Sequence, residues 1–534
     1  MSPSVAGRLR RFLRADAMVA AGILISRAAG VVRTSAISFF FGLKSEEVDA
    51  FNAAFRIPNL LQNLFGEGAL SGSFIPVYTG LRVRAEDETA AQTARTFFVL
   101  LSAVVAVLVL VGMLAAPWIT PLLVPGFTGH KRELTIRLVR LLFPGAGLLV
   151  ASAWCLGVLN SHGKFLLSYS APVAWNAAMI ATLLVFGHGR DLDTLAIHLA
   201  WGSVVGSFLQ LAVQWPFARR LTHHERGMAI SEPVRQIGRN FIPITISRGA
   251  VQLTGYIDQY IASFLPTGGV TGLSNAQQLY TLPVSLFGIS ISAAELPALS
   301  QEVASHGEYD PSQRLAVYEP FRLRMNAGLQ RLAFFIVPSA VAFIGFGDLI
   351  AGALLQHGRF NPDDSRYVWG ILAGSSIGLL ASTMARLYSV AHYALGDAKK
   401  PLRFAFVRLA VAGGLGWVCA LVLPPLLGIG ERWGAAGLTA SAGVAGWLEF
   451  VLLRASLNQR IGATGIPASY VSRLWVSAIL AAGAGWGVRM ALPALHPLFR
   501  GAIVLPVFGA AYLGAATVMG IPLPGGLRRF RRTR

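Results

Sequence analysis

The sequence has few charged residues and almost no cysteine. Only 13% of its 534 residues are charged, whereas a soluble domain has about 25%. The hydrophobic fraction is 54% and the mean hydropathy is +0.58. The two cysteines, Cys155 and Cys419, lie far apart in apolar runs without metal-ligand spacing. These shortages argue against a soluble enzyme, a disulfide framework and a thiolate metal centre, and favour an all-α polytopic membrane protein.

Nucleotide-binding and hydrolase motifs are also lacking. The run GVLNSHGK at 157–164 has one residue too many between its glycines for a P-loop, and Phe165 stands where Ser or Thr should bind Mg²⁺. There is no GxSxG or HExxH run. We therefore expect no catalytic residue, metal or cofactor. Energy would come from an ion gradient, the membrane potential or substrate flux.

Acidic residues are scarce, at 25 Asp and Glu against 45 Lys and Arg. A surplus of this size can indicate nucleic-acid binding in a soluble chain. Here the basic residues cluster in alternate loops, with 24 on the side of the N-terminus and nine opposite. This is the positive-inside pattern, which predicts that both termini are cytoplasmic and that nucleic acid is not a partner.

Apolar runs predict fourteen transmembrane helices. The first, about 17–41, follows a basic stretch that resembles a signal peptide, but the run continues past any cleavage site and is expected to be retained. The second, about 53–81, is interrupted by Pro58, Gly66, Gly68, Gly72 and Pro76 and is expected to be bent or partly unwound. The others are expected at about 96–116, 134–159, 165–187, 194–217, 237–265, 271–300, 327–355, 367–395, 402–428, 433–457, 470–492 and 498–520.

A weak internal repeat at an offset of 221 residues divides these helices into two sets of six. The tripeptide at 25–27 recurs at 246–248, and Pro76 recurs as Pro297. An even number of helices per repeat gives both halves the same orientation. We expect an N-lobe at 1–230, a C-lobe at 231–457, and two further helices with a basic tail at 458–534.

Ionisable residues lie within or beside the first two apolar segments, namely Arg27, Arg33, Asp49, Arg56 and Glu67. Such groups are costly at membrane depth unless they face a partner or a wet cavity. Several arginines in one cavity suit an anionic, phosphorylated substrate, because a guanidinium offers paired donors to phosphate. The alternatives are structural bridges to Asp49 or Glu67, and snorkelling of Arg56 to the interface.

Further ionisable residues lie in the second half of the chain. In the seventh segment, Arg248 and Asp258 can each form an ion pair with the first half, and Asp258 can instead bind a coupling cation or proton. Glu295, Arg386 and Glu449 are expected to pair between helices.

The run VDAFNAAFRIPNLLQNLFGEGALSGSFIPVY closely resembles the signature of the MurJ/MviN family, the bacterial lipid II flippases of the MOP exporter superfamily. Supporting runs are VLNSHGKFLLSYSAPVAWN, YIDQYIASFL, ELPALS and ALGDAKKP. The resemblance implies two six-helix lobes around a central cationic cavity that binds a polyprenyl diphosphate, with helices 13 and 14 holding the lipid tail. By motif position, Arg27, Arg33, Asp49 and Glu67 match family residues, and Arg56 matches a basic position. The full set of candidate substrate-binding residues is Arg27, Arg33, Asp49, Arg56, Asn59, Gln62, Glu67, Arg248 and Gln278, and Asp258 is the candidate for ion coupling.

The chain departs from the family pattern at several positions. Gln62 stands where the family usually has a basic residue, and Gln277, Gln278 and Thr281 stand where Asp, Arg and Glu are expected. Neutral amides form weaker bonds to phosphate than charged donors do.

The function expected from this resemblance is alternating-access transport of lipid II from the inner to the outer leaflet of the bacterial cytoplasmic membrane. The alternatives are a flippase for another lipid-linked oligosaccharide and a precursor-binding scaffold that does not transport. Expected partners are lipid II or a related glycolipid, membrane lipids and cell-wall synthesis proteins.

Overall fold

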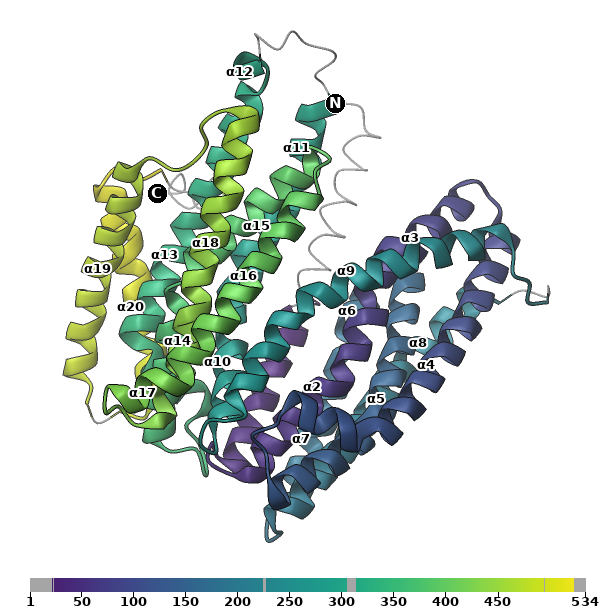
Figure 1. The fold of residues 1–534 in the computed structure, drawn as a ribbon, viewed down its shortest axis with the longest axis horizontal. Helices are drawn as coiled ribbons and strands as arrows, with labels where there is room; N and C mark the ends of the chain where they lie inside the picture. The colour runs from purple at the N-terminus through teal and green to yellow at the C-terminus, as the bar shows by residue number, and fades with distance from the viewer. Residues whose placement is uncertain (1–21, 23, 224–226, 305–313, 494, 523–534) are drawn as a thin grey trace. The chain divides into compact units, whose positions relative to one another are not determined.

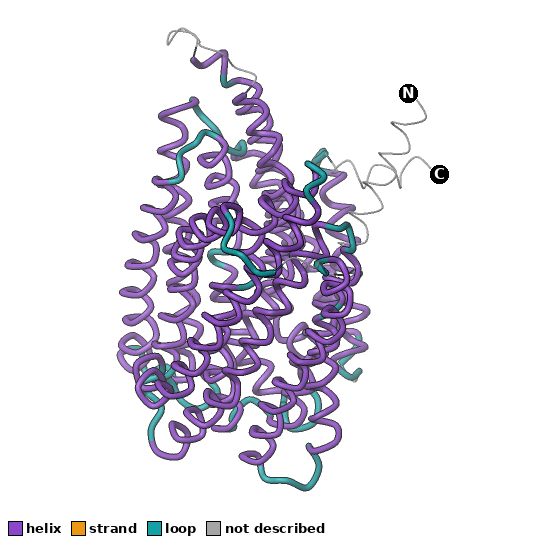
Figure 2. Tube along the Cα trace, turned by 90° about the vertical axis from the view of Figure 1, so that its right-hand side faces the viewer, coloured by secondary structure: helices purple, strands orange, loops and turns teal. Residues whose placement is uncertain are grey.

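The computed structural model describes residues 22, 24–223, 227–304, 314–493 and 495–522. Helices joined by short loops make up these residues, and the described part of the chain contains no strand (Figures 1 and 2). The all-α class expected from the sequence is therefore confirmed. Two compact units are formed, unit 1 by residues 1–271 with 357–359, and unit 2 by 272–356 with 360–534.

The helices of unit 1 begin with an unlabelled first helix, Leu24–Phe41. They continue as α2 (Glu46–Phe65), α3 (Glu67–Val83), α4 (Asp87–Leu123), α5 (Gly129–Ser161), α6 (Phe165–Ser170), α7 (Pro172–Phe186), α8 (Leu192–Leu221) and α9 (Glu232–Ala262).

Unit 2 contains the remaining helices, apart from the first residues of α10. These are α10 (Gly269–Pro283), a π-helix (Val284–Ile289), α11 (Ser290–Ala304), α12 (Arg314–Val317), α13 (Glu319–Leu355), α14 (Pro362–Ser376), α15 (Leu379–Ala394), α16 (Lys399–Trp417), a second π-helix (Val418–Val422), α17 (Leu423–Leu426), a 3₁₀ turn (Glu431–Trp433), α18 (Gly434–Ile461), α19 (Ala468–Ala491) and α20 (Pro497–Val518).

Each of the fourteen predicted segments corresponds to a helix or a broken pair of helices in the described chain. Eleven helices are long and apolar enough to span a membrane, or twelve if the bent pair of α14 and α15 counts as one span. The segments that fall short are α2 with α3, and α9, which carry polar and charged residues. The multi-span class is confirmed, and the count of fourteen spans stays a prediction.

The second segment is broken, as its glycines and prolines predict. It divides into α2 and α3 at Gly66, whose ψ of -150° is not helical. The bend between α14 and α15 is a second break, of 44°. There Trp447 Nε1 donates to the Ile377 carbonyl at 2.8 Å. Freed backbone groups are thus satisfied by side chains, which is the condition for a broken helix inside a bilayer.

Helix α5 is the central helix of unit 1. It packs against α2, α3, α4 and α8 (Figure 1), and 72% of its most apolar window is buried, against 22% for α4. Two clusters of buried apolar side chains meet on it. One is contributed chiefly by α3, α4, α5 and α9, and the other by the first helix, α2, α5, α7 and α8.

Helix α13 has the same place in unit 2. It packs against α11, α14, α15, α19 and α20. The last two helices pair with each other and are fastened to α13 by Tyr512, whose hydroxyl donates to the Phe334 carbonyl at 2.6 Å, and by a two-bonded ion pair between Arg489 and Asp348.

Candidate functional site

Helix α2 is held along its length by α9. Pro58 lies inside α2 and removes one backbone donor. Three side chains of α9 donate to carbonyls of α2, at 3.4 Å from Thr245 to Leu64, 3.0 Å from Tyr256 to Arg56, and 3.3 Å from Gln259 to Ala53. The partners run in opposite directions along the chain, so α2 and α9 are antiparallel. A helix weakened by proline therefore keeps its position through polar contacts with its neighbour.

Asp49 lies at the start of α2 in a buried polar network. Its carboxylate accepts from Lys131 Nζ at 2.8 Å, from the backbone N–H groups of Gly268 and Thr271 at 2.9 Å each, and from the Thr271 hydroxyl at 2.5 Å. Asp49 is 1% exposed. Both carboxylate oxygens are thus used inside unit 1, and Asp49 joins α2, α5 and α10. Lys131, which the sequence places among the loop cations, is buried and paired.

Arg33 of the first helix lies against aromatic rings. Its guanidinium carbon is 4.7 Å from the centre of the Trp175 ring and 6.0 Å from that of Phe55. These rings stack on each other at 5.7 Å, and Trp175 Nε1 donates to the Ser203 carbonyl at 3.1 Å. Arg33 forms no ion pair in the described chain, and its Nε is buried without a hydrogen-bond partner. We call Arg33, Phe55 and Trp175 the cation–aromatic site.

Arg56 points from α2 to α9. Its guanidinium lies 5.7 Å from the centre of the Tyr256 ring and touches the position that a Cβ on Gly255 would occupy. Asp258 attracts it electrostatically. The sequence left open an ion pair between Asp258 and the first half of the chain, and this arrangement resembles that pair. The Arg56 side chain extends toward α9, and it does not run along its own helix to the membrane interface.

The other predicted substrate-binding residues have fewer contacts. Arg27, Asn59 and Gln62 are half-buried, and their side chains form no hydrogen bond with the described residues. The side chains of Glu67 and Arg248 lie outside the described part of the chain. The structure therefore places Arg33, Arg56, Asn59 and Gln62 on or beside α2, and no hydrogen bond or ion pair among the described residues joins Arg27 to them.

Unit 2 contains the remaining predicted residues. Gln278 and Thr281 are half-buried, and exposed Gln277 of α10 is bonded to Thr281. The other carboxylates at depth are paired, as the sequence predicts. Glu295 binds Arg324 at 2.9 Å and Arg331 at 2.8 Å, and Glu449 binds Arg408 at 2.9 Å. The same expectation is wrong for Arg386, which forms no ion pair with the described residues.

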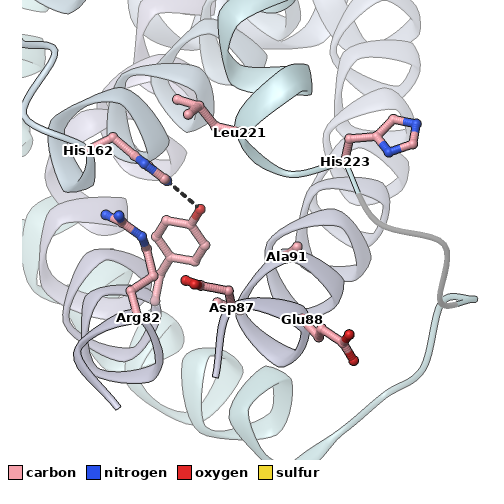
Figure 3. Close-up of a pocket in the computed structure, with 9 residues that line it drawn as sticks. Arg82, Asp87, Glu88, Ala91, His162, Leu221 and His223 are labelled. Carbon is pink, nitrogen blue, oxygen red and sulfur yellow. Dashed lines mark hydrogen bonds between the residues drawn. The ribbon is translucent and has the colours of Figure 1, made fainter. Parts of the chain in front are cut away.

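A cavity of about 400 Å³ opens where α3, α5 and α8 end and α4 begins (Figure 3). Its walls carry Arg82, Asp87, Glu88 and His223, and the Tyr78 hydroxyl lies 3.0 Å from Nε2 of His162. Burial, together with the nearby charges of Arg82 and Lys164, lowers the pKa of His162 to about 4. His162 is therefore neutral at physiological pH. None of the residues of the cation–aromatic site lines this cavity.

Comparisons with known proteins give the chain its relatives. A family model described as "Lipid II flippase MurJ" matches residues 37–503. The chain is 31% identical to a "Probable lipid II flippase MurJ" of Bdellovibrio bacteriovorus, over 97% of each chain. This chain belongs to the MurJ family of lipid II flippases. It is also 29% identical to a "Lipid II flippase MurJ" of Burkholderia cenocepacia, over 95% of this chain and 97% of the relative.

Solved structures show the same fold. A MurJ lipid II flippase in an inward closed conformation matches with a TM-score of 0.73 and 19% identity, covering 94% of this chain and 98% of that one. A multidrug resistance MATE family transporter of the MOP superfamily matches with a TM-score of 0.62 and 16% identity, covering 81% and 95%. The MurJ family assignment expected from the sequence motifs is confirmed, and both solved structures share the fold.

Sequence reasoning missed the neighbours that position the predicted residues. Trp175 and Phe55 hold Arg33, Tyr256 holds Arg56, and Lys131 neutralises Asp49. The only tryptophan of the predicted segment 165–187 was an available signal for Trp175. The pairing of Lys131 had no local signal, because 82 residues separate it from Asp49.

Proposed function

We propose that this MurJ family protein is a lipid II flippase, which carries the polyprenyl-diphosphate-linked peptidoglycan precursor from the inner to the outer leaflet of the cytoplasmic membrane. The observation that carries the proposal is Arg33, a cation in an apolar segment with aromatic neighbours and no carboxylate partner in the described chain. Burying an unpaired charge is costly. A diphosphate would supply the missing negative charge.

The geometry of the cation–aromatic site suits this role. Ring faces attract a cation without occupying its N–H donors. The stacked pair of Trp175 and Phe55 therefore restrains the guanidinium of Arg33 while leaving donors for two phosphate oxygens. Because Trp175 is itself bonded to Ser203, the aromatic support is fixed before the substrate arrives.

The other residues have different parts in the proposal. Arg27, Asn59 and Gln62 supply additional donors, since their side chains form no hydrogen bond with the described residues. Asp49 has a structural role, because its oxygens are already used by Lys131, Thr271 and the N–H of Gly268. Asp258 acts as the counter-ion of Arg56, and a coupling cation beside that guanidinium would be repelled.

Transport is proposed to occur by alternating access, with both termini in the cytoplasm and both lobes taking part. The basic residues in alternate loops support this orientation. Arg248, Glu67 and Gln278 remain proposed substrate contacts from the sequence alone.

The decisive experiment is rescue of a bacterium depleted of its own lipid II flippase. The wild-type chain should restore growth, and Arg33→Ala should not, although both proteins reach the membrane in equal amounts. If the wild-type chain fails to restore growth, the proposal is overturned. Binding of lipid II without translocation in reconstituted vesicles would instead indicate a scaffold, and translocation of another glycolipid alone would indicate a different cargo.

A further inference from the structure

Arg386 is a second arginine at membrane depth without a carboxylate partner in the described chain. It lies in α15, its side chain is exposed, and it forms neither an ion pair nor a hydrogen bond with the described residues. An intramembrane arginine is expensive unless it meets water or an anion. As for Arg33, a group near Arg386 must supply water or negative charge to its guanidinium.

Snorkelling does not explain this residue. Arg386 lies eight residues before the end of α15 at Ala394, which corresponds to about 12 Å along a helix that rises about 1.5 Å per residue. That distance exceeds the reach of an arginine side chain. The guanidinium must therefore be solvated or neutralised within the membrane-spanning part of unit 2.

The neighbouring polar groups form a cluster on four helices. Arg408 of α16 binds Glu449 of α18 at 2.9 Å through Nη1, and its Nε is buried without a partner. Tyr280 of α10 lies 3.0 Å from the Ser382 hydroxyl, one turn before Arg386. Helices α15 and α16 both pack on α18 (Figure 1). The cluster thus brings a free guanidinium close to a second one with a spare donor.

The charges of this cluster do not balance. The ionisable groups within electrostatic range of Arg386 are Tyr280, Tyr393, Arg408 and Glu449. Tyrosines are neutral at physiological pH, so two guanidinium groups face one carboxylate. Glu449 is already bonded to Arg408, which leaves a net charge of +1 beside Arg386.

We propose that Arg386 and Arg408 form a second anion-binding site, within unit 2, that takes the phosphate of a lipid headgroup. Phosphate oxygens would accept hydrogen bonds from the N–H groups of Arg386 and from Nε–H of Arg408. The bond to Nε would satisfy this buried nitrogen, which has no partner in the described chain. Glu449 and Tyr280 are positioning residues, since Glu449 orients Arg408 and Tyr280 packs beside Arg386. The proposal does not depend on the cargo proposed for Arg33.

Two sources can supply such a phosphate, the isoprenoid diphosphate of a lipid-linked precursor and the phosphodiester of a bulk phospholipid. The full-length protein in neutral detergent should therefore be titrated separately with farnesyl diphosphate and with phosphatidylglycerol, with binding followed by native mass spectrometry. Arg386→Gln should weaken binding of one or both by at least about tenfold, because bonds to charged groups are at stake.

Three further variants make the test specific. Arg366→Gln removes an exposed arginine of the same unit that has no partner in the described chain, and it should bind normally. Arg386→Lys should bind with intermediate affinity, because it keeps the charge but not the paired donors. Glu449→Gln should bind several-fold more tightly, because it frees Arg408, and a merely structural role for Glu449 predicts no such gain.

The outcomes separate this site from the one in unit 1. Arg33→Ala should remove a farnesyl diphosphate site and leave the site at Arg386 intact. Unchanged binding by a folded Arg386→Gln protein, judged by its melting temperature, would overturn the proposal, as would an equal loss in Arg366→Gln. Loss of phosphatidylglycerol binding alone would identify a phospholipid site, and loss of farnesyl diphosphate binding alone a precursor site.

Discussion

The two units treat charge at membrane depth in different ways. In unit 2, the buried carboxylates of Glu295 and Glu449 are paired with arginines, since Glu295 binds Arg324 and Arg331 and Glu449 binds Arg408. In unit 1, the buried carboxylate of Asp49 forms an ion pair with Lys131, and the guanidinium of Arg33 contacts aromatic rings without a carboxylate partner in the described chain. Ion pairs fix helices, whereas an arginine on rings keeps its donors. The comparison indicates that unit 1 offers a charge to a ligand, and that most charges of unit 2 hold its helices together.

The largest effect is expected where the charge of unit 1 is removed. Arg33→Ala should abolish translocation of lipid II in reconstituted vesicles without unfolding the protein, because it deletes the donors proposed for the diphosphate. Arg27→Ala is expected to do the same. Arg366→Ala, which removes an exposed arginine of unit 2, is the matched control and should transport normally. Undiminished transport by both variants of the first helix would contradict the site.

Asp49 is expected to stabilise unit 1 through its ion pair with Lys131. Asp49→Asn should lower stability by about 3–5 kcal/mol, because it leaves the buried Lys131 without its counter-ion. A fall in melting temperature in detergent would show this. The double variant Asp49→Asn with Lys131→Met should recover part of the loss, since no buried charge remains. A single variant as stable as the wild type would mean that the pair does not stabilise unit 1.

Gly255→Ala tests whether the position of Arg56 matters apart from its charge. The new methyl group would occupy the place of the guanidinium and displace it from Tyr256 and Asp258. We expect translocation to fall several-fold while the melting temperature changes little, because the end of a flexible side chain can move. Gly249→Ala, where an added Cβ would meet only Leu64 at 3.4 Å, is the control on the same helix.

A smaller gain is expected when a neutral amide is replaced by a charge. Gln62→Arg and Gln278→Arg should each bind farnesyl diphosphate a few-fold more tightly, because charge-assisted bonds are roughly twice as strong as neutral ones. Asn63→Arg adds the same charge at the exposed neighbouring position of α2. If Asn63→Arg gives an equal gain, the effect is general attraction and Gln62 does not mark a phosphate contact.

The smallest effect concerns pH. His162 has a pKa of about 4 in the folded protein, below the ordinary value of 6.5. Between pH 6.5 and about 4, the unfolded chain binds a proton at His162 and the folded chain does not. The contribution of neutral His162 to the free energy of unfolding is therefore present above pH 6.5 and is lost as the pH falls to about 4. The slope of melting temperature against pH in this range should become shallower in His162→Gln. An unchanged slope would assign the pH dependence to other groups.

The sequence predicted the helical class, the positions of all fourteen segments and the break in the second, because long apolar runs and clustered glycines act locally. It also predicted the pairing of Glu295 and Glu449, since a buried carboxylate needs a partner. It did not predict that Lys131 neutralises Asp49 or that Trp175 supports Arg33, because these contacts join residues far apart in the chain. For Arg386 the general rule of pairing was wrong, since the nearest carboxylate is already bonded to Arg408.

The three bonds from α9 to the carbonyls of α2 have a mechanical consequence. Their donors, at Thr245, Tyr256 and Gln259, are spaced to match three particular carbonyls. Sliding one helix past the other by less than a turn would break all three contacts together. A slide of one full turn would bring Tyr256 to the carbonyl of Ala53 or Gln259 to that of Arg56, because the two donors and the two carbonyls have the same spacing of three residues. Motion of α2 during a transport cycle should therefore either carry α9 with it as one rigid pair or shift against it in steps of one turn.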